Sequence, residues 1–309
     1  PDLALVLCMS FGAGAPLLRA LSFMSTMPQI NYKITALEQL MNAPALEQKE
    51  KPFTGKDHSI SFENVRFAYK EDEVLHGVSL TVPEGSLTAL VGESGSGKST
   101  LAKLRVHYYD VTGGSIQVGG QDLREMSVEA LNDQISYVSQ EQFLFNMSLL
   151  ENIRLGKSEA TDEEVLAAAE KAQCMEFLAR LPQGIHTMAG DGGKQLSGGE
   201  RQRISLARAI LKDAPIVVLD EAMAFADAEN ELALREGMAE LLQGKTVLMI
   251  AHRLYSIRDA DCIYVLDSGR LAESGTHQEL LDKNGLYAHL WAIQNETEVW
   301  QMKGGVSPA

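Results

Sequence analysis

The first stretch of the chain is almost wholly apolar. Residues 3–18 read LALVLCMSFGAGAPLL, and Arg19 ends the run. This run is shorter than the ~20 residues that cross a bilayer as a helix. Two interpretations remain open: a buried helix, or the end of a transmembrane helix whose start lies upstream. A basic leader and a small-residue cleavage site are both absent, which disfavours a signal peptide.

A change of periodicity predicts a domain boundary. After the apolar run, hydrophobic residues recur at helical intervals until a polar connector, ALEQKEKPFTGKDHS, is reached. We therefore assign residues 1–52 to the end of a transmembrane helix and a linker. Residues 53–309 form the second domain.

Strand patterns dominate the start of the second domain. In ISFENVRFAY the apolar residues alternate, Ile60 with Phe62 and then Val65 with Phe67, as in a half-buried strand. SLTALVG, PIVVLDEA and TVLMIAH are short, continuous apolar runs. Such runs are typical of strands that are covered on both faces. An α/β core is the prediction.

The middle of the chain predicts helices instead. TDEEVLAAAEKAQCMEFLARL begins with a capping box, Thr161 with Glu164. Apolar residues then share one helix face: Val165, Ala169, Ala172, Met175 and Leu178. We expect an inserted helical subdomain at about residues 141–212. A short helical tail should follow from Thr276.

Composition and charge exclude some classes of function. The chain is 45% hydrophobic and 22% charged, which is ordinary for a folded protein. Its formal net charge of -15 argues against a nucleic-acid groove, because phosphate backbones require clustered Lys and Arg. The cysteines Cys8, Cys174 and Cys262 lack metal-ligand or redox spacing, so a reduced, cytosol-facing protein is predicted.

A glycine-rich loop supplies the first candidate chemistry. GESGSGKST follows an apolar strand and precedes good helix formers, which is the context that a phosphate loop requires. Glycines let backbone N–H groups turn towards phosphates, Lys98 would reach the β and γ phosphates, and Ser99 would bind Mg²⁺. The predicted nucleotide-binding residues are Gly92, Glu93, Ser94, Gly95, Ser96, Gly97, Lys98, Ser99 and Thr100.

Two adjacent acids follow a buried strand in IVVLDE. Asp220 is predicted to hold the metal through water, while Glu221 faces the reacting phosphate. Hydrolysis needs a base that orients and deprotonates water, and Glu221 suits that role.

A second glycine-rich stretch, LSGGERQR, has no lysine. Ser197, Gly198 and Gly199 precede a helix whose apolar face includes Ile204 and Ala207, so they lie at a helix N-terminus, which attracts anions. A single nucleotide cannot easily be wrapped by two helix ends of one rigid domain. We therefore expect this turn to cap the nucleotide held by another copy.

These motifs, in this order, resemble the nucleotide-binding cassette of ABC ATPases over about residues 58–294. The resemblance implies an α/β P-loop NTPase core with an inserted helical subdomain. It also implies ATP and Mg²⁺ as cofactors, and a second cassette paired head to tail. By resemblance, Tyr69 stacks on adenine, Gln140 senses metal and γ-phosphate, His252 is the switch histidine, and Asp227 lies in a loop that crosses between copies. The implied catalytic residues are Glu221, His252, Gln140 and Lys98; the implied metal residues are Ser99, Gln140 and Asp220.

Further features are similar to exporter-type transporters. TMAGDGGKQLSGGE resembles their loop before the signature, and EQFLFNMSLLENIRLG resembles the segment that receives a coupling helix. Phe143 and Phe145 would form its apolar socket, although core packing explains them equally well. The expectation is a half-transporter fused to a transmembrane domain in the inner (plasma) membrane, with the cassette on the cytoplasmic side. The alternative is a soluble ABC ATPase of a nucleic-acid machine; no coiled-coil insertion, second cassette or basic face supports it.

Two departures from the family pattern stand out. Arg105 occupies a helix position where similar cassettes usually carry an apolar residue, so we expect it to reach solvent or an acid. AFADAENE resembles a subgroup of half-transporters linked to iron-siderophore traffic.

Overall fold

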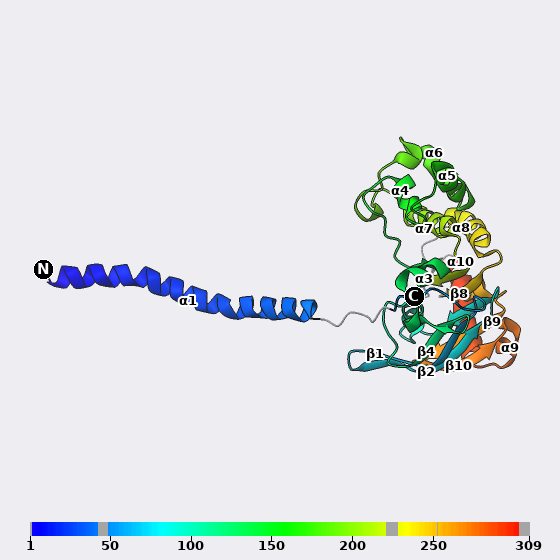
Figure 1. Cartoon of the computed structure of the whole chain (residues 1–309), viewed down its shortest axis with the longest axis horizontal. Helices are drawn as coiled ribbons and strands as arrows, with labels where there is room; N and C mark the ends of the chain where they lie inside the picture. The colour runs from blue at the N-terminus through cyan, green and yellow to red at the C-terminus, as the bar shows by residue number, and fades with distance from the viewer. Residues whose placement is uncertain (1, 43–48, 221–227, 252, 303–309) are drawn as a thin grey trace, which may run out of the picture. The chain divides into compact units, whose positions relative to one another are not determined.

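The computed structural model describes residues 2–42, 49–220, 228–251 and 253–302 (Figure 1). It forms two units, Pro1–Glu47 and Gln48–Ala309. The first unit holds one 40-residue helix, α1 (Asp2–Met41), with Pro16 and Pro28 inside it. Leu18 and Phe23 of α1 are exposed, and both interpretations of residues 3–18 stay predictions. Among the described residues, no helix combines the length and apolar character needed to cross a membrane.

The larger of two sheets in the second unit is six-stranded, in the order β10-β9-β3-β8-β7-β6. Strands β9, β3, β8, β7 and β6 are parallel, and β10 pairs antiparallel with β9 at one edge. The strands are β3 (Leu87–Val91), β6 (Ile135–Val138), β7 (Ile216–Asp220), β8 (Thr246–Ile250), β9 (Cys262–Asp267) and β10 (Arg270–Gly275). Parallel strands end at one edge of a sheet, so the loops that follow β3, β6 and β7 all start at that edge.

Both faces of this sheet are covered, as the continuous apolar runs predicted. Every residue of β7 and of β8 is buried. Neighbouring residues along β7 belong to different apolar clusters: Val217 and Leu219 to one, and Val218 to the other. Successive strand side chains point to opposite faces, so each cluster packs on its own side of the sheet.

The smaller sheet is antiparallel and four-stranded, in the order β2-β1-β4-β5. Its strands are β1 (Ile60–Tyr69), β2 (Asp72–Val82), β4 (Gly113–Val118) and β5 (Gln121–Asp122). The alternation predicted for β1 is confirmed: Ile60, Phe62, Val65 and Phe67 are all buried. Its register shifts between Phe62 and Val65, next to Asn64 at φ 47. This bulge explains why the apolar period breaks there.

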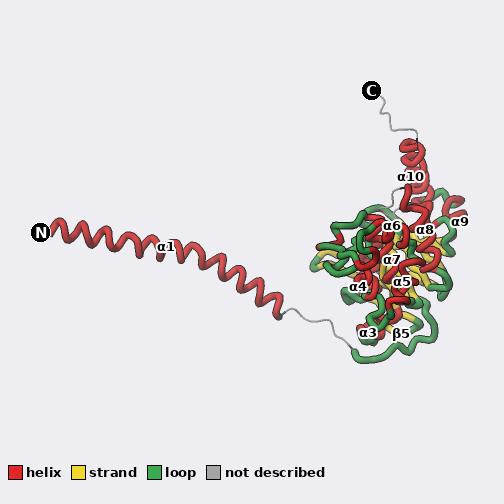
Figure 2. Tube along the Cα trace, turned by 90° about the horizontal axis from the view of Figure 1, so that it is seen from above, coloured by secondary structure: helices red, strands yellow, loops and turns green. Residues whose placement is uncertain are grey.

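Helices gather at one end of the second unit, away from the strands, where Figure 1 labels α4, α5, α6 and α7. In Figure 2 the last part of α10 extends away from the body of the unit. The α-helices are α2 (Lys98–Arg105), α3 (Val128–Gln134), α4 (Leu149–Arg154), α5 (Asp162–Lys171), α6 (Met175–Arg180), α7 (Gly198–Lys212), α8 (Ala228–Leu242), α9 (His277–Asp282) and α10 (Leu286–Met302). Short 3-10 helices are η1 (Leu123–Glu125), η2 (Gly184–His186), η3 (Asp191–Gly193) and η4 (Leu254–Ile257). The proposed domain boundaries, including the subdomain at 141–212, stay predictions.

The helix predicted to follow Thr161 is shorter than its apolar pattern suggested. The capping box of Thr161 and Glu164 is present. The helix ends at Lys171, however, because Gln173 adopts φ 57, and α6 starts at Met175. Met175 is therefore exposed rather than part of the buried face.

Arg105 contradicts the expectation that it would reach solvent or an acid. The side chain ends α2 and is 0% exposed. Within the part of the chain that the structure describes, its Nε, Nη1 and Nη2 have no hydrogen-bond partner. Burial alone lowers the pKa of Arg105 to about 9. The fold therefore encloses a cation without compensation, which costs stability.

Candidate functional site

The phosphate loop runs from the end of β3 to the start of α2, and its shape requires glycine. Gly92, Gly95 and Gly97 adopt φ 145, 84 and 101. A Cβ at Gly92 would lie 2.1 Å from the backbone oxygen of Leu266, so a side chain has no room there. Gly97 directly precedes α2, so the backbone N–H groups of the loop lie at the N-terminus of this helix, where the helix dipole is positive.

Lys98 is buried within this loop. Its Nζ donates to the backbone oxygens of Gly92 at 2.9 Å and Glu93 at 2.7 Å. A hollow of about 220 Å³ adjoins it, lined by Val74, Ser94, Gly95, Gly97, Lys98, Ser99 and Thr100. The hollow thus lies between the Lys98 ammonium group, the backbone of the glycine loop and the N-terminus of α2. Such an arrangement is suited to binding phosphate.

The sheet order brings Ser99 and Asp220 together, although they are far apart in the sequence. Asp220 ends β7 and is 5% exposed. Ser99 Oγ donates to its Oδ1 at 3.3 Å. Hydroxyl and carboxylate oxygens are ligands that Mg²⁺ accepts, and Mg²⁺ usually takes one or two carboxylates and completes its shell with water and phosphates. These residues therefore fit the predicted cation.

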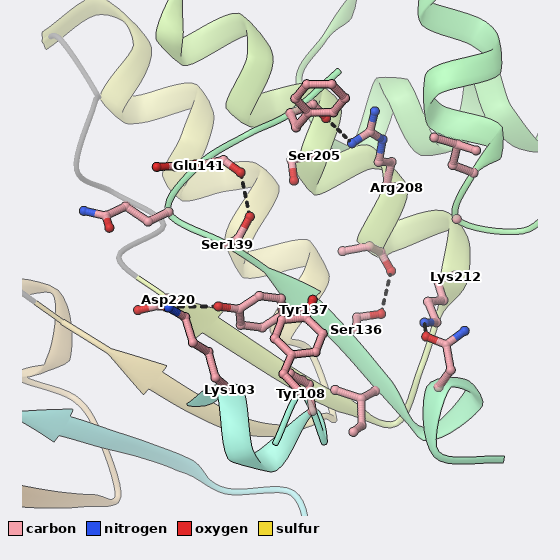
Figure 3. A pocket seen from close by; sticks show the side chains of 18 of the residues that line it. Lys103, Tyr108, Ser136, Tyr137, Ser139, Glu141, Ser205, Arg208, Lys212 and Asp220 are labelled. Atoms are coloured by element: carbon pink, nitrogen blue, oxygen red, sulfur yellow. Dashed lines mark hydrogen bonds between the residues drawn. The ribbon is translucent and has the colours of Figure 1, made fainter. Parts of the chain in front are cut away.

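A larger cavity of about 910 Å³ opens beside these residues, and Gln140 lies on its wall with Ser99 and Asp220. Figure 3 shows Tyr137, Tyr108 and Lys103 on the same wall, with the hydroxyl of Tyr137 directed at Asp220. That hydroxyl donates to Asp220 Oδ2 at 3.0 Å. Burial, and then the charge of Asp220 and the hydrogen bond to it, raise the pKa of Tyr137 well above its usual value.

Ser197 directly precedes α7 and is its N-cap residue. Its Oγ accepts from the backbone N–H of Glu200 at 3.3 Å, and Glu200 Oε2 accepts from the N–H of Ser197 at 2.8 Å. Ser197 is exposed and Gly198 is half-buried, whereas Gly199 is buried. None of these residues is among the described residues that line the hollow beside Lys98. Ser197 thus faces solvent, and the second glycine turn takes no part in the hollow beside Lys98 of its own chain.

Tyr69 ends β1 and is half-exposed next to two other aromatic rings. Its ring lies edge-on to Phe67, with centroids 4.8 Å apart, and to Tyr109 at 5.4 Å. These contacts hold an aromatic cluster at the end of the strand, and the stacking of Tyr69 on adenine stays a prediction. The predicted residues Glu221, Asp227 and His252 lie outside the described residues.

A family profile described as ABC transporter matches residues 75–224, which include the phosphate loop, Gln140, the glycine turn and Asp220. The chain belongs to the ABC transporter family. Its fold is that of the P-loop NTPase cassette, a domain that binds ATP across the family. The resemblance seen in the sequence is therefore confirmed, together with the fold class.

Relatives among ABC proteins are similar over most of this chain. An ATP-dependent lipid A-core flippase of Alkalilimnicola ehrlichii is 46% identical over 263 residues, covering 84% of this chain and 45% of the relative. A mitochondrial potassium channel ATP-binding subunit of Homo sapiens is 46% identical over 236 residues, covering 75% and 32%. A bacterial Atm1-family ABC exporter with ATP bound superposes with a TM-score of 0.79 at 40% identity, covering 87% of this chain and 48% of that one. The chain spans less than half of the length of these relatives.

The ABC cassette also carries a polar network that sequence reasoning missed. Phe143 and Phe145 are 56% and 53% exposed, and their rings meet edge-on at 5.1 Å. Arg208 of α7 donates to the backbone oxygens of Phe143, at 2.8 Å, and Asn152, at 2.6 Å. Buried Asn152 accepts from Phe145 N–H at 2.9 Å and donates to the backbone oxygens of Phe145, Met147 and Ser148. Hydrogen bonds thus connect the backbone of the exposed aromatic pair to α7. Burial lowers the pKa of Arg208 to about 10.

The residues that sequence reasoning missed are Tyr137, Asn152 and Arg208. No motif singled them out: Tyr137 and Arg208 have partners that are distant in the sequence, whereas Asn152 also bonds to the loop just before its own helix. One signal was available: Asn152 and Arg208 are polar residues with apolar neighbours in the helix patterns LLENIRL and SLARAI. Polar residues on a predicted buried face have to find hydrogen-bond partners, which marks them as structurally important.

Replacing Asn152 by alanine is expected to destabilise the cassette by about 2 kcal/mol. The loss leaves backbone oxygens and part of the Arg208 guanidinium group without their partner in a buried site. Chemical denaturation monitored by circular dichroism measures the change. The exposed Asn146, in the loop that leads into α4, provides the control. An Asn152 variant as stable as the Asn146→Ala variant would contradict the assigned role.

Proposed function

We propose that this chain is the ATP-binding and ATP-hydrolysing part of an exporter-type half-transporter, which drives movement of a solute across a membrane. The contact between Ser99 and Asp220 at the phosphate loop carries the proposal, because it assembles a cation site beside a phosphate site. The identities to the lipid A-core flippase and the Atm1-family exporter support the transport class. No finding favours a nucleic-acid machine, and the net charge of -15 disfavours it.

In the proposed reaction each residue has a separate task. Lys98 and the loop N–H groups hold the β and γ phosphates, and Tyr69 stacks on adenine. Ser99, Asp220 and Gln140 hold Mg²⁺, which offsets negative charge on the phosphates when bound. Glu221 orients and deprotonates the attacking water, and His252 contacts the γ-phosphate. These roles follow from the resemblance and from the geometry around Lys98 and Asp220.

We infer that two cassettes share each nucleotide. The turn of Ser197, Gly198 and Gly199 lies at the N-terminus of α7 with Ser197 exposed, so it would offer N–H groups to a phosphate held by another copy. Asp227 would lie at the same contact. The partner is a second cassette, identical or from a related half-transporter.

We further propose that the aromatic pair receives a helix of the transmembrane domain. The pair is exposed on the wall of the 910 Å³ cavity, and the Arg208 and Asn152 hydrogen bonds hold its backbone. Residues 1–52 would connect to that domain, in the inner (plasma) membrane with the cassette on the cytoplasmic side. The siderophore resemblance of AFADAENE stays a prediction about cargo.

The shared site predicts that Ser197→Arg lowers ATP hydrolysis by about 100-fold or more while a single subunit still binds ATP. The bulky cation would prevent the turn from closing over the partner's phosphates. Radiolabelled phosphate release and equilibrium ATP binding in dilute protein measure the two properties.

Since Ser197 caps α7, the loss of a cap needs its own control. Thr161→Arg removes a capping box of the same type from α5 in the same lobe, at an exposed position. This control should retain hydrolysis. An equal loss of ATP binding in dilute Ser197→Arg protein would contradict the shared site.

A further inference from the structure

Asp220 is oriented by two neutral donors, one on each carboxylate oxygen. Ser99 Oγ lies 3.3 Å from Oδ1, and the Tyr137 hydroxyl lies 3.0 Å from Oδ2. Asp220 is 5% exposed as a residue, so little water competes with these two donors for its oxygens. With both oxygens engaged, the plane of the carboxylate is fixed by the protein itself.

The position of Tyr137 follows from the sheet. β6 and β7 are parallel neighbours, with Tyr137 paired to Val218 and Val138 to Leu219. Val218, the pairing partner of Tyr137, lies two residues before Asp220 on β7. The side chains of Tyr137 and Asp220 therefore point to the same face of the sheet. Its long phenol reaches forward to the strand end, as Figure 3 shows. A shorter side chain at this position could not make the contact.

Tyr137 also faces the large cavity. Its ring meets Tyr108 edge-on, with centroids 6.3 Å apart, and both rings line the 910 Å³ cavity together with Phe143 and Phe145. The Tyr137 hydroxyl thus contacts the Asp220 carboxylate, while the Tyr137 ring forms part of the cavity wall.

We propose that Tyr137 is a positioning residue for the cation site. Its hydroxyl holds the Asp220 side chain in the orientation that places Oδ1 beside Ser99 Oγ before a divalent cation arrives. The inference rests on the proposed ATPase function and deepens it. Partners that orient a metal-binding group typically change metal affinity about 10- to 100-fold when removed.

Tyr137→Phe tests the hydroxyl alone, because phenylalanine keeps the ring, its volume and its contact with Tyr108. The measurement is Mn²⁺ binding by electron paramagnetic resonance to the whole chain with a non-hydrolysable ATP analogue. We expect the variant to bind Mn²⁺ about 10-fold more weakly and the metal-free analogue with unchanged affinity.

The matched control is Tyr264→Phe, which also removes one hydrogen-bonded phenol hydroxyl. Tyr264 Oη donates to the backbone oxygen of Thr81 at 3.1 Å, a contact that involves neither Asp220 nor Ser99. This control should bind Mn²⁺ like the unmodified chain. Mn²⁺ affinity of Tyr137→Phe within about twofold of the control would overturn the positioning role. If the unmodified chain bound no Mn²⁺ with nucleotide, the proposed ATPase function would itself be overturned, and this inference with it.

Discussion

Replacing Glu221 by glutamine is expected to lower ATP turnover by roughly 10²- to 10⁴-fold and to leave ATP binding intact. Glu221 directly follows Asp220, which ends β7 at the carboxyl edge of the parallel sheet. Glutamine has nearly the same size but cannot accept a proton from water. The change therefore removes the base without removing Lys98, Ser99 or Asp220, which hold the nucleotide and the cation in the proposed site.

Steady-state phosphate release and equilibrium binding of ATP measure the two effects separately. Glu170→Gln offers a matched control, because this carboxylate is exposed on α5. The control should hydrolyse ATP at the parent rate. Turnover by Glu221→Gln within a few-fold of the control would remove Glu221 from the role of base.

Replacing Arg105 by leucine is expected to stabilise the protein by about 3 kcal/mol, which is unusual for a single substitution. The guanidinium group is 0% exposed and, among the described residues, has no hydrogen-bond partner on any nitrogen. Buried Leu101 and Leu104 lie on the same helix, so leucine suits the surroundings. The substitution removes the cost of desolvating a charge and keeps an apolar side chain in the space.

The pH dependence of this gain follows from the lowered pKa of Arg105. Folding lowers it from 12.5 to about 9, so between these values the unfolded chain binds more protons and the penalty shrinks as pH rises. Below about pH 9 Arg105 is charged in both states and the penalty is fully present. The gain from Arg105→Leu should therefore be constant across neutral pH.

Urea denaturation of both proteins at two neutral pH values measures the gain. Arg105→Lys is the control, because lysine keeps a buried cation at the same position and should give no comparable stabilisation. A leucine variant no more stable than the lysine variant would show that the buried charge costs the native protein little.

Local features of the site could be predicted because neighbouring residues encode them. The phosphate loop requires positive φ at Gly92, Gly95 and Gly97, and only glycine adopts such angles without strain. The cap at Ser197 needs only Glu200, three residues later. The burial of Ile60 and Phe62 follows from alternation along a strand. A local exception was missed at Gln173, whose left-handed φ of 57 ends α5 inside an unbroken apolar pattern.

By itself, then, the amino-acid sequence determined the motifs, their secondary structure and the family, since each depends on residues within one turn or one strand. Only the tertiary structure decided which distant side chains meet. Tyr137 contacts Asp220 across 83 positions, and Arg208 contacts Asn152 across 56. These pairs depend on the order of strands in the sheet and on the packing of α4 against α7. Arg105 is the same kind of case, because enclosure by the fold, rather than any neighbour in the sequence, leaves its guanidinium group without a hydrogen-bond partner among the described residues.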